Sequence, residues 1–247
     1  MLRVRPIVNT PDLPGASRFL QALGLRPAAD PAPSGSYAVF DASSGRVALH
    51  ACEPGSPEDG TTSLAFDVSD VREFARRTAE GGARLTVELS REGHGLAARV
   101  SAPDGMSFLA DAGPRETGAP PSPLAVLVRW YTPDVGPAVG VLQDIGARSR
   151  ISSDTGTWHD FRAKNGGLVA AHTGHRTAAE LAFEYDGDVQ DLLGGLTGAG
   201  FEPAVVDGSY GRSLRVRAPW GAEVWINECR REFLGRSTDR IQGRVSA

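Results

Sequence analysis

The chain repeats itself, and this internal repeat constrains its fold more than any other feature of the 247 residues. Thr10-Pro11-Asp12 recurs as Thr132-Pro133-Asp134, and each triplet precedes apolar residues spaced i, i+3, i+4, i+7. That spacing is typical of one buried helix face. The two stripes are Ala16, Phe19, Leu20, Leu23 and Ala138, Val141, Leu142, Ile145. The sequence therefore predicts two similar units.

The correspondence continues through segments that read as strands. Val47-Ala48-Leu49-His50 matches Val169-Ala170-Ala171-His172, and Leu64-Ala65-Phe66 matches Leu181-Ala182-Phe183. Between the copies, residues 113–123 are rich in Pro and Gly, which is typical of a linker. We expect domains at 1–113 and 124–228, a linker at 114–123 and a C-terminal tail at 229–247.

A weaker repeat lies inside each copy, because each copy holds two strand–helix–strand–strand–strand patterns. Asp12, Asp70, Asp134 and Asp188 all stand where a helix N-cap belongs. The second helix of each copy is expected from Val71, Phe74, Ala75 and Thr78, and from Val189, Leu192, Leu193 and Leu196. The expected fold class is α+β, with four βαβββ units paired into two domains.

Composition excludes several function classes. Acidic residues outnumber Lys and Arg by 30 to 26, so nucleic acid is not an expected partner. No apolar run reaches the roughly 18 residues that a membrane span needs, and the start carries no apolar signal core. Two cysteines, Cys52 and Cys229, make no disulfide framework, so we expect a reduced, cytoplasmic protein.

The repeated pattern resembles the vicinal-oxygen-chelate proteins, which include glyoxalase I, bleomycin-resistance proteins, fosfomycin-resistance enzymes and extradiol dioxygenases. The resemblance lies in the phrase TPDLPGASRFLQALGL, in SLAFDVSDV and in APDGMSFLAD, and it covers residues 3–227 in two copies. It implies glyoxalase-like domains whose sheets curl around cavities. It also implies either a monomer with pseudo-dimeric domains or a further homodimer.

The resemblance further implies four strand positions at which metal-using relatives carry their ligands. In the first copy these positions hold Arg5, Ala48, Ser63 and Leu109, and in the second they hold Leu127, Ala170, Glu180 and Trp225. A catalytic divalent ion needs about three His, Cys, Asp or Glu ligands. Neither copy provides them, nor does a set assembled across the two domains, so no metal and no cofactor are expected.

Two histidines occupy matched positions. His50 and His172 lie two residues beyond a ligand position and so point to the same sheet face. Each is expected either to bond a neighbouring loop or to contact a ligand, with metal binding as a third reading. His159 and Asp160 are neighbours in a strand, so they point apart and form no catalytic pair.

Aromatic side chains and one arginine complete the candidate ligand-binding set. Tyr37 matches Trp158, Trp225 stands at a ligand position, and Tyr210 precedes a loop glycine, as His94 does in the first copy. Arg5, on an inner strand, is expected either to pair with Glu180 across the domains or to be solvated at a strand edge. Trp220, in a turn, is expected to be a ligand lid or an interdomain contact.

Three functions compete. We expect a metal-free, non-catalytic protein that binds a small aromatic or amphipathic molecule in a cavity, because aromatic residues stand where relatives carry metal ligands. The alternative is a metal-dependent lyase, isomerase or dioxygenase with unusual ligands such as His172 and Glu180. The third is an interaction module whose cavities are filled by side chains.

Overall fold

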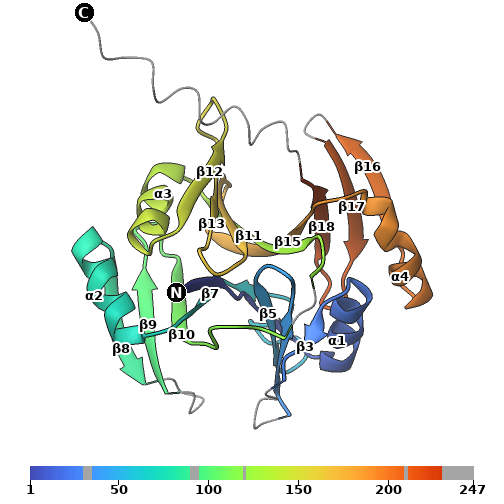
Figure 1. The fold of residues 1–247 in the computed structure, drawn as a ribbon, viewed down its shortest axis with the longest axis horizontal. Helices are drawn as coiled ribbons and strands as arrows, with labels where there is room; N and C mark the ends of the chain where they lie inside the picture. The colour runs from blue at the N-terminus through green and yellow to red at the C-terminus, as the bar shows by residue number, and fades with distance from the viewer. Residues whose placement is uncertain (30–34, 90–94, 119–120, 209–210, 230–247) are drawn as a thin grey trace, which may run out of the picture.

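The computed structural model describes residues 1–29, 35–89, 95–118, 121–208 and 211–229. The chain forms two sheet-rich halves, and each half carries helices on its outer side (Figure 1). Within these described ranges, no helix is long and apolar enough to cross a membrane. This mixture of curled sheets and flanking helices is the expected α+β class.

The N-terminal half runs from β1 to β10. Its two helices are α1 (Leu13–Ala22) and α2 (Val71–Gly81). Its strands are β1 (Leu2–Val4), β2 (Ile7–Thr10), β3 (Arg26–Pro27), β4 (Tyr37–Asp41), β5 (Arg46–Ala51), β6 (Thr62–Ser63), β7 (Ala65–Val68), β8 (Arg84–Leu89), β9 (Leu96–Ser101) and β10 (Ser107–Ala112).

The C-terminal half runs from β11 to β18. Its helical segments are α3 (Val135–Asp144), the 3-10 turn η1 (Val189–Leu192) and α4 (Leu193–Gly198). Its strands are β11 (Leu124–Thr132), β12 (Arg148–Ser152), β13 (Trp158–Arg162), β14 (Leu168–Thr173), β15 (Ala178–Tyr185), β16 (Ala204–Gly208), β17 (Gly211–Arg217) and β18 (Glu223–Glu228).

Strand pairing arranges the C-terminal half as one curved sheet and the N-terminal half as two runs of strands. In the C-terminal half the order β12-β13-β14-β11-β15 continues through β18 and β17 to β16. Figure 1 shows this sheet bent into a U with α3 and α4 on its outer side. In the N-terminal half, β1-β7-β10-β9-β8 and β6-β2-β5-β4-β3 are two separate runs. One pair, Ala179 opposite Thr62, joins the β15 and β6 edges of the two halves.

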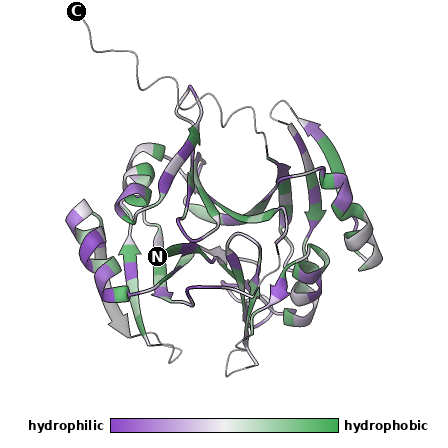
Figure 2. Cartoon of the chain, in the orientation of Figure 1, coloured by the Kyte–Doolittle hydropathy of each residue, from purple (hydrophilic) through white to green (hydrophobic). Residues whose placement is uncertain are grey.

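The core lies between the outer faces of the two sheets and includes side chains from both halves. All eight residues of the α1 and α3 stripes are buried, as predicted from their spacing. The four aspartates each accept a backbone N–H at a helix start, so the predicted caps are confirmed. In Figure 2, α2 carries many hydrophilic residues, whereas the central strands of the upper sheet are mostly hydrophobic.

The last predicted helix is shorter than its stripe suggests. Val189 and Leu196 are fully buried, but Leu192 and Leu193 are only partly buried. The segment divides into η1 and α4, and α4 contains Gly194, Gly195 and Gly198. Glycine in a helix interior costs about 1 kcal/mol relative to alanine, which explains the short, broken helix.

Trp220 packs in the interface between the two halves. Its side chain is 5% exposed, and its ring meets Phe19 of α1 edge-on at 5.3 Å between centroids. Phe19 also contacts Phe201 at 5.1 Å. The expectation of an interdomain contact is confirmed, and the expectation of a ligand lid is wrong because the indole is inside the core.

Candidate binding trough

Side chains that point away from the shared core line the inner face of each curved sheet. We call these faces the N-terminal trough and the C-terminal trough. The N-terminal trough is lined by Arg3, Arg5, Tyr37, Asp41, Arg46, Ala48, His50, Ser63, Asp67, Leu109 and Asp111. The C-terminal trough is lined by Leu127, Arg129, Tyr131, Arg150, Trp158, Asp160, Leu168, Ala170, His172, Glu180, Ala182, Glu184, Arg215 and Trp225. Strand alternation therefore brings the predicted positions together within each half.

Charged side chains fill the N-terminal trough. Arg5 donates to Asp67 at 2.5 Å and also bonds Asp111 and the Tyr37 hydroxyl. Arg46 donates to Asp41 at 2.6 Å and to Asp67 at 3.2 Å. Burial lowers the pKa of Arg5, but Tyr37, Asp67 and Asp111 together raise it above its usual value. The network is a closed structural unit with its charges paired.

The expected pairing of Arg5 with Glu180 is wrong, and so is the solvated alternative. Arg5 is 5% exposed and its partners belong to its own half. Glu180 instead accepts a hydrogen bond from Arg129 at 3.0 Å. Asp67 lies on β7, which pairs with β1, and Asp111 lies on β10, the next strand of the same sheet, so both partners of Arg5 belong to the N-terminal half.

His50 and Tyr37 lie opposite each other on β5 and β4, with ring centroids 6.4 Å apart. The His50 Nδ1 also lies 3.1 Å from the Asn9 Oδ1. In these contacts both His50 and Tyr37 interact with neighbouring protein groups inside the N-terminal trough. They favour the structural reading of His50 over a ligand contact.

An aromatic row crosses the C-terminal trough. Trp158 lies opposite His172, and the two rings stack with an interplanar angle of 18° and centroids 6.1 Å apart. Tyr131 continues the row, with its ring centroid 5.8 Å from that of His172. Burial, aided by Arg129, lowers the pKa of His172 to about 4, so this imidazole is neutral near pH 7. The row offers neutral ring surface.

Trp225 lies between two arginines in the same trough. The Arg215 guanidinium carbon is 3.7 Å from the Trp225 ring centroid, and that of Arg129 is 5.2 Å away. Each distance is within the range of a cation–π contact. The Trp225 Nε1 donates to the Glu223 carboxylate at 2.9 Å. Trp225 is thus a trough residue rather than a core residue.

The floor of the C-terminal trough is apolar and built from small or medium side chains. Leu127, Leu168, Ala170 and Ala182 form a hydrophobic cluster separate from the main core. Two of these four are alanines, whose short side chains add little bulk to the floor. An apolar floor beneath a few polar groups is the usual composition of small-molecule sites.

An ion pair bridges this trough from wall to wall. Arg150 on β12 donates to Glu184 on β15 at 2.9 Å, although β13, β14 and β11 lie between these strands in the sheet. Arg150 also lies 3.7 Å from Asp160. A hollow of about 430 Å³ adjoins the pair and is lined by Ser44, Ala125, Arg150, Arg162, Ala163, Lys164, Gly166, Gly167, Leu168 and Glu184.

Three polar atoms of the C-terminal trough are buried without a hydrogen-bond partner among the described residues. They are the Nε of Arg129, the Nε of Arg215 and the Oδ1 of Asp160. Burial, with a smaller contribution from Glu184, raises the pKa of Asp160 to about 7 despite the opposing effect of Arg150. Unsatisfied buried polar groups are costly, so these three atoms are available to a hydrogen-bonding partner.

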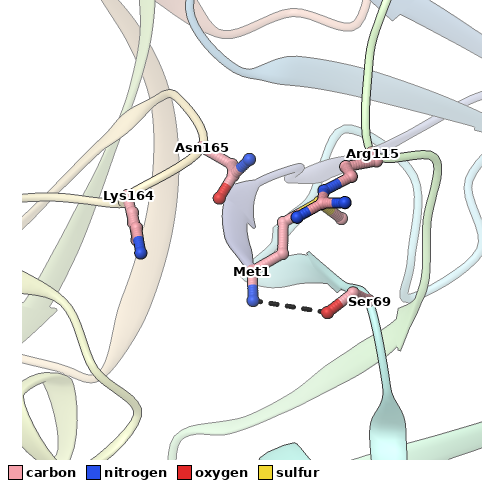
Figure 3. A pocket seen from close by; sticks show the side chains of 5 residues that line it. All are labelled: Met1, Ser69, Arg115, Lys164 and Asn165. Carbon is pink, nitrogen blue, oxygen red and sulfur yellow. Dashed lines mark hydrogen bonds between the residues drawn. The ribbon is translucent and has the colours of Figure 1, made fainter.

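A second hollow of about 430 Å³ lies at the chain start and is lined by Met1, Ser69, Arg115, Lys164 and Asn165. Figure 3 shows the Met1 amine directed at Ser69, and these two atoms are 3.4 Å apart. Lys164 and Asn165 stand on the opposite side. No aromatic side chain lines this hollow, so it offers less to an organic ligand than the trough does.

The donors at the four resemblance-derived positions do not fit a metal ion. Leu127, Ala170 and Trp225 provide no ligand atom, and Glu180 is held by Arg129. In the described part of the chain, no three His, Cys, Asp or Glu side chains are grouped to hold a metal. A catalytic ion would need at least two further donors.

Sequence reasoning missed Arg129, Arg215 and Asp160. The strand register pairs Arg215 with Trp225 and places Arg129 opposite Glu180, so alternation along β11 and β17 was the available signal. Asp160 does point away from His159, as expected, because His159 bonds Ser149 while Asp160 faces Arg150. Tyr210 and His94 lie outside the described residues.

Solved structures with the same fold are dioxygenases and a glyoxalase. The 2,3-dioxygenase LapB from Pseudomonas sp. KL28 has a TM-score of 0.63 at 14% identity, covering 92% of this chain and 91% of that one. The Mn(II)-bound glyoxalase from Novosphingobium aromaticivorans has a TM-score of 0.61 at 18% identity, covering 92% and 80%. Homoprotocatechuate 2,3-dioxygenase from Arthrobacter globiformis has a TM-score of 0.59 at 17% identity. The match covers 92% of this chain and 78% of that one.

No curated protein matches the sequence. The family model described as Glyoxalase/Bleomycin resistance protein/Dioxygenase superfamily matches residues 3–109. The solved structures extend the same fold over both halves. The expected resemblance to this superfamily is therefore confirmed by the family model over residues 3–109 and by the shared fold over both halves.

Proposed function

We propose that the protein binds a small aromatic or amphipathic molecule in the C-terminal trough without a metal ion. The observation that carries this proposal is the contrast between the two troughs. Buried ion pairs around Arg5 and Arg46 fill the first trough. The second also holds an ion pair, Arg150–Glu184, but combines it with an aromatic row, a small apolar floor and three unsatisfied polar atoms. Such a surface suits a planar organic ligand.

The proposal includes the domain organisation that the sequence predicts. The chain would be a tandem repeat of two glyoxalase-like domains, 1–113 and 124–228, joined by a linker at 114–123. Only the second domain would retain a ligand cavity. The first would act as a filled structural partner, as the ion-pair network around Arg5 supports.

Binding is tested by calorimetric titration of the full chain with naphthalene-ring compounds, followed also by tryptophan fluorescence. We expect Trp225→Leu to weaken binding about tenfold, since a stacked aromatic contributes on the order of 1 kcal/mol beyond its buried area. Leu109 occupies the position of Trp225 in the first half, so Leu109→Ala is the matched control and should leave affinity unchanged. Equal loss in both variants, or no binding by the unmodified chain, would contradict the proposal.

The alternative is a metal-dependent dioxygenase or lyase. It is supported by the fold shared with two 2,3-dioxygenases and a Mn(II)-bound glyoxalase. Elemental mass spectrometry of protein purified without chelator separates the two readings. About one divalent ion per chain would favour the alternative, and less than about a tenth would favour metal-free binding.

A further inference from the structure

We propose that the ligand of the C-terminal trough is a planar aromatic anion whose charged oxygens are held by Arg129 and Arg215. This inference rests on the proposed function and adds the charge class of the ligand. It comes from the two guanidinium groups near Trp225, each of which has an Nε without a hydrogen-bond acceptor.

Arg215 has no acidic partner among the described residues, and its Nε is buried without an acceptor. Its guanidinium instead lies against the Trp225 ring at 3.7 Å. A stacked guanidinium keeps its in-plane N–H groups available for an acceptor, because the ring occupies only the face of the plane. Arg215 therefore offers hydrogen-bond donors that the protein itself does not use.

Arg129 is only partly neutralised. Its side chain is 11% exposed, whereas its partner Glu180 is 51% exposed, so water screens this ion pair. The Arg129 Nε also lacks an acceptor. Two arginines therefore lie near Trp225. Glu180 pairs with Arg129 alone, and the Glu223 carboxylate bonds the Trp225 indole rather than either guanidinium. This imbalance favours an anionic ligand over a neutral or cationic one.

The geometry also favours a planar anion. Guanidinium groups bind carboxylates through two parallel N–H···O bonds, which fixes the plane of the ligand. The aromatic row of Trp158, His172 and Tyr131 lies across the floor from Trp225 and provides ring surface for the apolar part. A phenolate would use the same donors with a single oxygen.

The N-terminal half lacks this arrangement. Arg99 stands at the position of Arg215 and donates to Ser107, but Leu109 takes the place of Trp225. Ile7 takes the place of Arg129 on the matching strand. Arg99→Gln therefore removes the same charge from an equivalent strand position without touching the proposed site.

The test is calorimetric titration of the full chain with 1-naphthoate, 1-naphthamide and 1-naphthylmethylammonium, which share one ring and differ in charge. We expect naphthoate to bind at least about tenfold more tightly than the amide, and the ammonium to bind most weakly. Arg215→Gln should weaken naphthoate about tenfold and leave the amide unchanged. Arg99→Gln should change neither.

Arg215→Lys separates the effect of charge from that of geometry, because lysine keeps the positive charge but loses the planar guanidinium. We expect its affinity for naphthoate to lie between those of the wild type and Arg215→Gln. Unfolding midpoints confirm that each variant is folded. Equal affinity for naphthoate and naphthamide, or equal weakening of both by Arg215→Gln, would overturn the anion inference and leave aromatic binding standing. If none of the three probes binds, both proposals fall.

Discussion

Single residues at equivalent positions decide whether a trough is filled or open. Arg5 lies at the position that Leu127 takes in the second half, and its cation brings Asp67 and Asp111 into the N-terminal trough. A buried cation is tolerated only with partners, so one arginine requires a network. A leucine needs no charged partner, and Leu127 packs instead with Leu168, Ala170 and Ala182.

Asp160 should make stability depend on pH. Its folded pKa of about 7 exceeds the usual value near 3.9, so between these values the folded protein holds a proton that the unfolded chain has released. Stability from this group therefore falls as pH rises from about 4 to about 7. Relative to wild type, Asp160→Asn should gain up to about 4 kcal/mol across this window, measured by urea unfolding at several pH values.

His172 supplies the control with opposite sign. Its folded pKa of about 4 lies below the usual 6.5, so the unfolded chain binds more protons between these values and stability rises with pH. His172→Gln should lose stability relative to wild type as pH rises from about 4 to 6.5. A difference between Asp160→Asn and wild type that stays constant with pH would show that Asp160 titrates normally.

The sequence predicted the residue-scale site in part. Trp158, His172, Glu180 and Trp225 all lie in the C-terminal trough, because repeat position and strand alternation determine the face of each side chain. The partner of Arg5 could not be predicted. That choice depends on which acidic side chain approaches most closely after the strands pair, and Asp67 and Asp111 are distant from Arg5 in sequence.

At the scale of elements, local signals determined three of the four expected helices. An aspartate cap, an apolar stripe and a terminal glycine agree in α1, α2 and α3. The fourth stripe has an aspartate cap and buried Val189 and Leu196, but glycines interrupt it. Apolar spacing alone therefore predicted too long a helix, because the low helix propensity of the glycines in α4 shortens it.

Glycine substitutions in α4 should have opposite effects at adjacent positions. Gly194 is exposed, and a Cβ there would meet nothing within 4 Å, so Gly194→Ala should stabilise the protein by about 0.5–1 kcal/mol. A Cβ at Gly195 would lie 2.9 Å from the Ala22 carbonyl oxygen, so Gly195→Ala should destabilise by about 1–3 kcal/mol. Thermal unfolding of both variants is the measurement. Equal shifts would mean that α4 does not pack on the end of α1.

At the scale of the whole molecule, the two halves share one core. Trp130 of β11 contacts Phe108 of β10 at 6.3 Å between centroids, and its Nε1 donates to Asp104 at 2.9 Å. On the opposite side, Trp220 packs on Phe19. Helices α2 and α3 lie side by side at one end and α1 and α4 at the other (Figure 1). The halves therefore stabilise each other.

Trp220→Ala should lower the free energy of unfolding by about 3–5 kcal/mol, because it empties a buried indole site at the interface between the halves. Trp225→Ala is the matched control on the next strand, and we expect a loss of about 1 kcal/mol, since that ring is partly exposed. Urea unfolding followed by circular dichroism measures both. A loss at Trp220 no larger than that at Trp225 would contradict its role in this interface.

The sequence by itself determined the order of elements, the helix starts and the side chains that share a face, because these depend on local spacing and on a repeat visible in one dimension. Only the tertiary structure decided that the first trough is filled, that Arg150 reaches Glu184 across the second, and that Arg215 lies on Trp225. Those contacts join strands far apart in sequence. They depend on sheet curvature, which no local pattern specifies.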